Sequence, residues 1–126
     1  MKANLDPALE TLTEKIIGAA FAVSNALGHG FLEAVYKNAL AEELSSKGIG
    51  VHKEKPFAIH YNGKKVGVYV ADVVVDNRVI VELKAVDALT RAHSAQVLNY
   101  LKASGLPVGL LMNFGTARVE MKRVIL

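Results

Sequence analysis

The chain has 126 residues, of which 52% are hydrophobic, so we expect residues 1–126 to form one domain with a substantial core. It contains no cysteine, which excludes a disulfide framework and a thiolate zinc site and fits a reducing cytoplasm, where we expect the protein to reside. No apolar stretch is long enough to cross a bilayer, and the net charge of +3 favours a polyanionic partner only weakly. The positive mean hydropathy of +0.27 predicts an apolar patch that a second copy covers, and therefore a homodimer.

Two helices are predicted before the first strand. The first begins after Asp6-Pro7, because aspartate followed by proline is typical of a helix start, and it ends at Gly28-His29-Gly30. The second is predicted over about 31–46, with Gly30 as its N-cap. In that frame Glu33 takes the third helical position, where a carboxylate interacts favourably with the helix dipole. The buried side is expected to hold the apolar residues at helical spacing, Leu32, Val35, Leu40 and Leu44.

Strands and one more helix follow. Three strands are predicted at 51–61, 64–75 and 79–86, and the first two are joined by the hairpin signal Asn62-Gly63. A third helix is predicted over about 90–103, and the last two strands at 108–113 and 117–125. The order α-α-β-β-β-α-β-β predicts an α/β (α+β) fold in which helices flank one mixed central sheet.

Three charged residues interrupt the two most apolar strands: Asp72, Glu82 and Lys84. Such residues cost stability inside apolar strands unless they have a function. Glu82 and Lys84 are two residues apart, so they share one face of their strand. If Asp76-Asn77-Arg78 is a three-residue turn, Asp72 lies opposite Glu82, whereas a two-residue turn would place the two carboxylates on opposite faces.

Two facing carboxylates are typical ligands of a hard divalent cation such as Mg²⁺. Asp72 and Glu82 would bind the ion, and the backbone carbonyl of Leu83 could supply a third oxygen. Lys84 could then orient a water molecule, act as its base, or stabilise the transition state. Glu33 is a further candidate acid that reaches the metal through a water. The alternative interpretation is a surface ladder of ion pairs in which Glu82 pairs with Lys84 or Lys65, with Glu33 serving only the helix dipole.

The third predicted helix carries a polar stripe of His93, Gln96 and Tyr100, which lie at helical spacing. The helix directly follows the strand that carries Glu82 and Lys84, so its start should lie close to the end of that strand. The stripe could therefore hold Lys84, the water or a phosphate group of the substrate. The alternative is a stripe that simply faces solvent.

The residues Gly30-Phe31-Leu32-Glu33-Ala34-Val35-Tyr36 match the signature of the GxxExxY protein family, and the chain resembles that family from about Ile16 to Val124. The family is assigned to the PD-(D/E)XK nuclease superfamily. Further matching segments are Ala71-Asp72, Glu82-Leu83-Lys84, Gln96-Val97-Leu98-Asn99-Tyr100 and Asn113-Phe114-Gly115. Alanine stands at position 71, where the name of the superfamily places proline.

The resemblance implies a restriction-endonuclease-like core whose active site has Asp72 and Glu82 on Mg²⁺ (or Mn²⁺), Lys84 beside the attacking water and Glu33 as an added acid. It also implies that Gln96 and Tyr100 border the active site and the DNA. The expected function is a magnesium-dependent nuclease that hydrolyses phosphodiester bonds in DNA, with RNA open as the ligand and with a protein partner that helps select the substrate. Two alternatives are a non-catalytic nucleic-acid-binding or assembly module with the same fold and a structural dimer whose charged residues satisfy one another.

Overall fold

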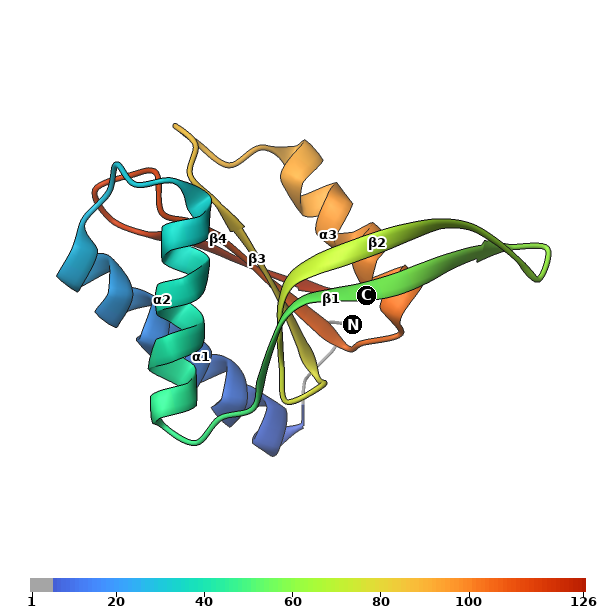
Figure 1. Cartoon of the computed structure of the whole chain (residues 1–126), viewed down its shortest axis with the longest axis horizontal. Helices are drawn as coiled ribbons and strands as arrows, with labels where there is room; N and C mark the ends of the chain where they lie inside the picture. The colour runs from blue at the N-terminus through green and yellow to red at the C-terminus, as the bar shows by residue number, and fades with distance from the viewer. Residues whose placement is uncertain (1–5) are drawn as a thin grey trace.

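The computed structural model describes residues 6–126 (Figure 1). The elements are α1 (Pro7–Leu27), α2 (Glu33–Ser46), β1 (Val51–Tyr61), β2 (Lys64–Val75), β3 (Val79–Lys84), α3 (Arg91–Ser104), β4 (Val108–Asn113) and β5 (Glu120–Ile125). The predicted order and the mixed α+β architecture are confirmed. The helix start after Asp6-Pro7 is also correct, because the Asp6 carboxylate accepts a hydrogen bond from the Leu9 N–H.

The five strands form one sheet in the order β1-β2-β3-β4-β5. The neighbouring strands are antiparallel except for β3 and β4, which run parallel and are connected through α3. All residues of β4 are buried, and so are the first five of β3. Buried apolar strands of this kind need cover on both faces of the sheet.

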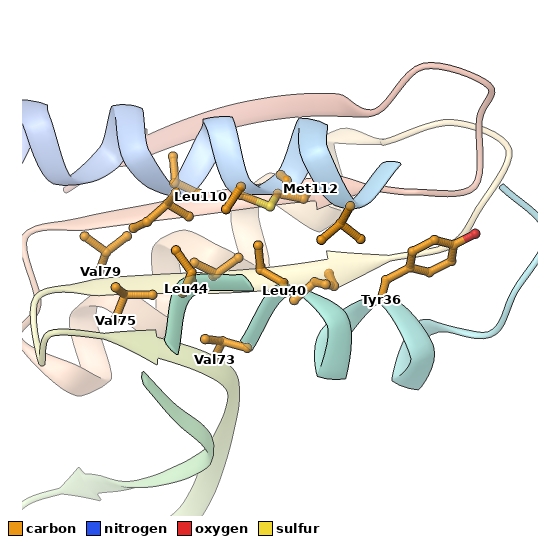
Figure 2. Packing of buried hydrophobic residues seen from close by; sticks show 14 of the residues in the cluster. Tyr36, Leu40, Leu44, Val73, Val75, Val79, Leu110 and Met112 are labelled. Carbon is orange, nitrogen blue, oxygen red and sulfur yellow. The ribbon is translucent and has the colours of Figure 1, made fainter. Parts of the chain in front are cut away.

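The helices provide that cover from opposite sides. α1 and α2 bury one face in a large cluster that includes Leu40 and Leu44 of α2 and Val73 and Val75 of β2 (Figure 2). On the other face, Leu101 of α3 packs in a smaller cluster built on the sheet. α3 approaches β4 closely, because a Cβ atom at Gly109 would lie 2.6 Å from the Val97 side chain.

The far part of the β1–β2 hairpin projects beyond the rest of the sheet, as Figure 1 shows. We call residues 55–70 the arm. Side-chain alternation in β2 changes where the arm meets the sheet: Ala71 packs in the α3 cluster, whereas Val73 packs in the α1/α2 cluster. On β1 this point coincides with Glu54, whose φ is 55°. Asp72 therefore lies at a break in the strand pattern.

The predicted start of α2 is wrong. The helix begins at Glu33 with Leu32 as its N-cap, so Glu33 occupies the first helical position and not the third. The cause is the Tyr36 hydroxyl, which donates to the Gly28 carbonyl at 2.8 Å and accepts from the Phe31 N–H at 3.2 Å. These bonds hold the preceding loop outside the helix.

The predicted buried side of α2 is half wrong for the same reason. Leu32 is 81% exposed and Val35 is 39% exposed, whereas Leu40 and Leu44 are fully buried. The stripe that packs on the sheet contains Tyr36, Leu40, Ala41 and Leu44.

Two strand ends also differ from the prediction. β3 ends at Lys84 instead of residue 86, because the Asn113 side chain bonds both the N–H and the carbonyl of Val86 and takes the place of a strand partner. β5 begins at Glu120 instead of residue 117, since residues 114–119 form a loop in which the Thr116 hydroxyl donates to the Arg118 carbonyl. Within residues 6–126, no helix combines the length and apolar character that a membrane span needs.

Candidate active site

The turn between β2 and β3 has three residues, which is the length required for Asp72 and Glu82 to lie opposite each other. Val75 pairs with Val79 and Val73 pairs with Val81, with Asp76 and Asn77 in the turn at φ values of 50° and 54°. Aspartate and asparagine tolerate this left-handed conformation better than most residues. Asp72 and Glu82 are the next residues along the two strands, directly beyond the last paired position.

Asp72 and Glu82 are linked by two reciprocal hydrogen bonds. The Asp72 N–H donates to Oε2 of Glu82 at 2.8 Å, and the Leu83 N–H donates to Oδ2 of Asp72 at 3.0 Å. Each carboxylate thus satisfies a backbone donor of the opposite strand where the regular ladder stops. No hydrogen bond of ordinary geometry reaches the other oxygen of either carboxylate within residues 6–126, although the Tyr69 hydroxyl lies close enough to Glu82 to lower its pKa.

This arrangement is electrostatically unfavourable for Glu82. Its side chain is buried, and burial together with the Asp72 carboxylate raises the pKa of Glu82 from 4.5 to about 7. The Lys84 ammonium acts in the opposite direction, which places its charge near Glu82. No ion pair joins Glu82 to Lys84 or Lys65 in the described chain, so the surface-ladder interpretation lacks its contacts.

Two tyrosines adjoin the carboxylates on the α3 side of the sheet. The rings of Tyr69 and Tyr100 are stacked, with an interplanar angle of 11°. Burial and the negative charges of Glu82 and Asp72 raise the pKa of Tyr100. The buried Tyr69 hydroxyl makes no hydrogen bond of ordinary geometry, yet it lies close enough to Glu82 for the carboxylate to raise its pKa.

A cavity of about 250 Å³ opens from Asp72 toward α2. Glu33, Lys37 and Leu83 line it together with Asp72. Glu33, at the first helical position of α2, therefore lines the cavity, even though the helix frame differs from the prediction. Lys37 also forms an ion pair of 3.0 Å with Glu54, which lies on the strand next to Asp72.

The three residues of the predicted polar stripe of α3 lie in different surroundings. Tyr100 adjoins the carboxylates, as described above. The His93 ring nitrogen Nδ1 accepts a hydrogen bond from the Thr90 N–H, so His93 closes a capping box at the start of α3. Gln96 is exposed one turn before Tyr100.

Two distant sequence motifs frame the site from the α1/α2 side. The Tyr36 ring stacks on Phe114 with centroids 4.8 Å apart. The Phe114 N–H donates to the Lys84 carbonyl at 2.8 Å, directly beyond the end of β3. A Cβ atom at Gly115 would overlap the backbone of Val86. The two motifs thus fix the backbone that carries Lys84.

The Asp72 and Glu82 carboxylates are suitable ligands for a divalent cation that is bound by few protein groups. No three His, Cys, Asp or Glu side chains gather into a ready metal cluster within residues 6–126. Mg²⁺, however, is commonly held by one or two carboxylates together with water. Asp72 and Glu82 supply two carboxylates with a free oxygen each, and the raised pKa of Glu82 marks negative charge that a cation would compensate.

Sequence reasoning missed Tyr69, Lys37 and the structural role of Asn113. Regular alternation places Tyr69 on the face opposite Asp72, and only the break in the strand brings it beside Glu82. Lys37 follows Glu33 by one helical turn, a spacing that indicates a shared helix face. Asn113 is a fully buried amide in an apolar strand, and that pattern in the sequence is a usable signal for a structural clamp.

A model of the PD-(D/E)XK nuclease superfamily matches residues 10–124, and nucleases of this superfamily generally use divalent metals. Among solved structures, the one described as "Crystal structure of SSO0001" is similar, with a TM-score of 0.55 and 20% sequence identity. The match covers 92% of this chain and 58% of that chain, so this chain spans little more than half of that protein. At this identity the likeness shows the fold alone. No curated protein matches the sequence.

Proposed function

Because the chain belongs to the PD-(D/E)XK nuclease superfamily, we propose that it is a magnesium-dependent nuclease that hydrolyses phosphodiester bonds in DNA. The observation that carries the proposal is the pair of carboxylates at the break between β2 and β3. Asp72 and Glu82 are anchored by backbone N–H groups, and each keeps one oxygen free. This is a preorganised pair of ligands, and Asp72 of the pair lines the cavity toward α2.

Each residue has a role that follows from its place. Asp72 and Glu82, with the Leu83 carbonyl, would hold the cation, and Glu33 at the cavity would hold a water next to it. A cation held there lowers the pKa of a water and neutralises charge that develops on the phosphate. Lys84 orients the attacking water and stabilises the transition state. Water's oxygen forms the new bond to phosphorus, the bond to the leaving oxygen breaks, and a proton ends on that leaving group.

Tyr100 and Gln96 are assigned to the substrate. Tyr100 is held against the carboxylates by its stack on Tyr69, and exposed Gln96 lies one turn away on the same helix. We assign no phosphate contact to the Nδ1 atom of His93, because this atom already accepts the Thr90 N–H.

The experiment is a cleavage assay on plasmid and single-stranded DNA with Mg²⁺ or Mn²⁺, compared with EDTA. Cutting should require the metal and should fall at least about 100-fold in Asp72→Asn and in Lys84→Met. The matched controls are Asp76→Asn and Lys47→Met, which change the same residue types at exposed positions outside the site. Cutting that persists in both site variants would refute the proposal.

The second candidate is a nucleic-acid-binding or assembly module without catalysis, or one that acts only with a protein partner. One observation favours it: both carboxylates already have a structural role in joining β2 to β3. Tight DNA binding without cleavage in any metal would support this candidate. RNA remains the alternative ligand. A labelled RNA of the same sequence as the DNA, used in the binding and cleavage assays, distinguishes RNA from DNA as the ligand.

We also propose membership of the GxxExxY family within the superfamily and a homodimer. The first is supported by the two roles of Tyr36, which stacks on Phe114 and bonds the loop at Gly28. The second is supported by three exposed valines of the arm, Val66, Val68 and Val70, which are 63%, 49% and 51% exposed.

A further inference from the structure

The positive charge of this chain is distributed unevenly. The arm contains Lys55, Lys64 and Lys65 and no acidic residue, and α3 contains Arg91 and Lys102 and likewise no acidic residue. The whole chain has a net charge of only +3, so the remainder is slightly acidic. The arm and α3 therefore form a basic side of a nearly neutral molecule.

The arm and α3 face each other across a groove of about 490 Å³. Ala58, Ile59 and His60 of β1 line one wall, and Asn99, Lys102 and Ala103 of α3 line the other. Lys65 pairs with His60 in the hairpin, next to the point between Ile59 and His60 where the register of the two strands shifts. The groove thus has Lys102 on one wall and His60 on the other, and Lys65 is the hairpin partner of His60.

The groove begins next to the candidate active site. Asn99 is the chain neighbour of Tyr100, and the Tyr100 ring lies near both carboxylates and stacks on Tyr69. A strand of nucleic acid that leaves the carboxylates on this side passes the tyrosine pair and then enters the groove. Aromatic rings on which bases stack, together with basic side chains, bind single-stranded nucleic acid, and the partly exposed Tyr100 is the aromatic residue that a base could reach here.

We infer that the groove between the arm and α3 binds the phosphate backbone of the substrate strand, with Lys65 and Lys102 as the phosphate contacts. This inference rests on the proposed function, because it assigns a path to the substrate of that reaction. The arm then serves as a grip that holds nucleic acid beyond the bond that is cut. It also gives the chain affinity that does not depend on base sequence.

The test is a binding assay in EDTA, where metal-dependent cleavage does not occur. The probe is a fluorescein-labelled single-stranded DNA of about 16 nucleotides, followed by anisotropy over a range of salt concentrations. Lys65→Ala/Lys102→Ala should weaken binding about tenfold near 100 mM salt. The slope of log K against log salt should fall by about 1.4, which corresponds to two phosphate contacts on a single strand.

The matched control is Lys15→Ala/Lys47→Ala, which removes two exposed lysines of α1 and the end of α2 and causes the same loss of net charge. It should bind nearly as the wild type. An equal loss in both double variants, no loss in either, or no binding by the wild type at low salt would each overturn the inference. Thermal unfolding of each variant verifies that it is folded.

The outcomes also separate this inference from the proposed nuclease. If Asp72-dependent cutting occurs but Lys65→Ala/Lys102→Ala binds normally, the groove assignment fails and the nuclease remains. If the lysine pair controls binding but no metal supports cutting, the nuclease fails and the groove remains.

Discussion

At the scale of single residues, the Asp72 and Glu82 side chains join two strands and also concentrate negative charge. One oxygen of each carboxylate accepts a hydrogen bond from a backbone N–H of the opposite strand, and Glu82 is only 5% exposed. The energetic consequence is the raised pKa of Glu82, whose first cause is burial and whose second is Asp72. Function at this site therefore has a measurable cost in stability.

The pH dependence of stability should show this cost. Glu82 has a pKa of about 7 in the folded chain against 4.5 without these effects, so between these values the folded state binds more protons than the unfolded state. Stability contributed by this group is complete below the lower value and is lost as the pH rises through the upper one. In EDTA, the unfolding free energy of the wild type should therefore fall relative to that of Glu82→Gln by about 1–3 kcal/mol as the pH rises from 4 to 8.

Urea unfolding of both proteins across that pH range is the measurement, with the exposed-site variant Glu14→Gln as the control. If the wild-type and Glu82→Gln curves run parallel across the range, the account of Glu82 is wrong. Mg²⁺ at high pH should also stabilise the wild type more than Glu82→Gln.

Gly115 gives a prediction about the loop that supports Lys84. An added Cβ would overlap the Val86 backbone, so Gly115→Ala should lose about 1–3 kcal/mol of unfolding free energy. Gly18→Ala is the matched control, because nothing lies within 4 Å of a Cβ there and alanine favours a helix interior by about 0.5–1 kcal/mol over glycine. Urea unfolding measures both, and wild-type stability in Gly115→Ala would contradict the packing described here.

At the scale of elements, the break in β2 and the loop before α2 determine the site. The sequence predicts the three-residue turn and therefore the neighbouring positions of Asp72 and Glu82, because turn length fixes strand register. It does not predict the change in alternation between Ala71 and Val73, which depends on the backbone of Glu54 in another strand. For that reason Tyr69 could not be placed beside Glu82 from periodicity.

The prediction of where α2 starts failed for a comparable reason. Glycine and helical spacing favour a helix from Phe31, but the Tyr36 hydroxyl holds Gly28 and Phe31 in a loop through two hydrogen bonds. A side-chain bond of this kind, which depends on the tertiary position of Tyr36 against Phe114, overrides local propensity. His93 in the polar stripe is similar, since its ring caps the helix that carries it.

Tyr36→Phe tests this clamp, because it removes the hydroxyl and keeps the ring that stacks on Phe114. The variant should lose about 1–2 kcal/mol of unfolding free energy, and hydrogen exchange at the Phe31 amide should accelerate. Tyr61→Phe is the matched control, since Tyr61 is 70% exposed and should tolerate the change. Equal effects of the two substitutions on stability and on exchange would show that the hydroxyl is not a clamp.

At the scale of the whole molecule, the arm has exposed valines on the side that faces away from α3 and a groove on the side that faces α3. Tyr69 packs toward α3, so its strand neighbours Val68 and Val70 point to the other side. The groove and the exposed valines can therefore be used at the same time, one by nucleic acid and the other by a second copy of the chain. Composition predicted an apolar patch, and the structure exposes apolar side chains both on the arm and around the start of α2, where Phe31 and Leu32 are exposed.

The homodimer proposal predicts a mass near twice 13.5 kDa in light scattering after gel filtration. Val68→Lys should shift the protein to the mass of one chain, because it places a charge in the apolar face. Thr11→Lys, at an exposed position of α1, should leave the dimer intact. A wild type that stays monomeric at every concentration would refute the dimer.

The central claim is that Asp72 and Glu82 converge on one divalent cation, and anomalous scattering from a crystal grown with Mn²⁺ tests it most directly. We predict one strong peak bonded to the oxygens of Asp72 and Glu82 that now lack a hydrogen bond, and its absence from a crystal of Asp72→Asn. A wild-type map with no peak between these two carboxylates, with both side chains still bonded only to the backbone, would contradict the account.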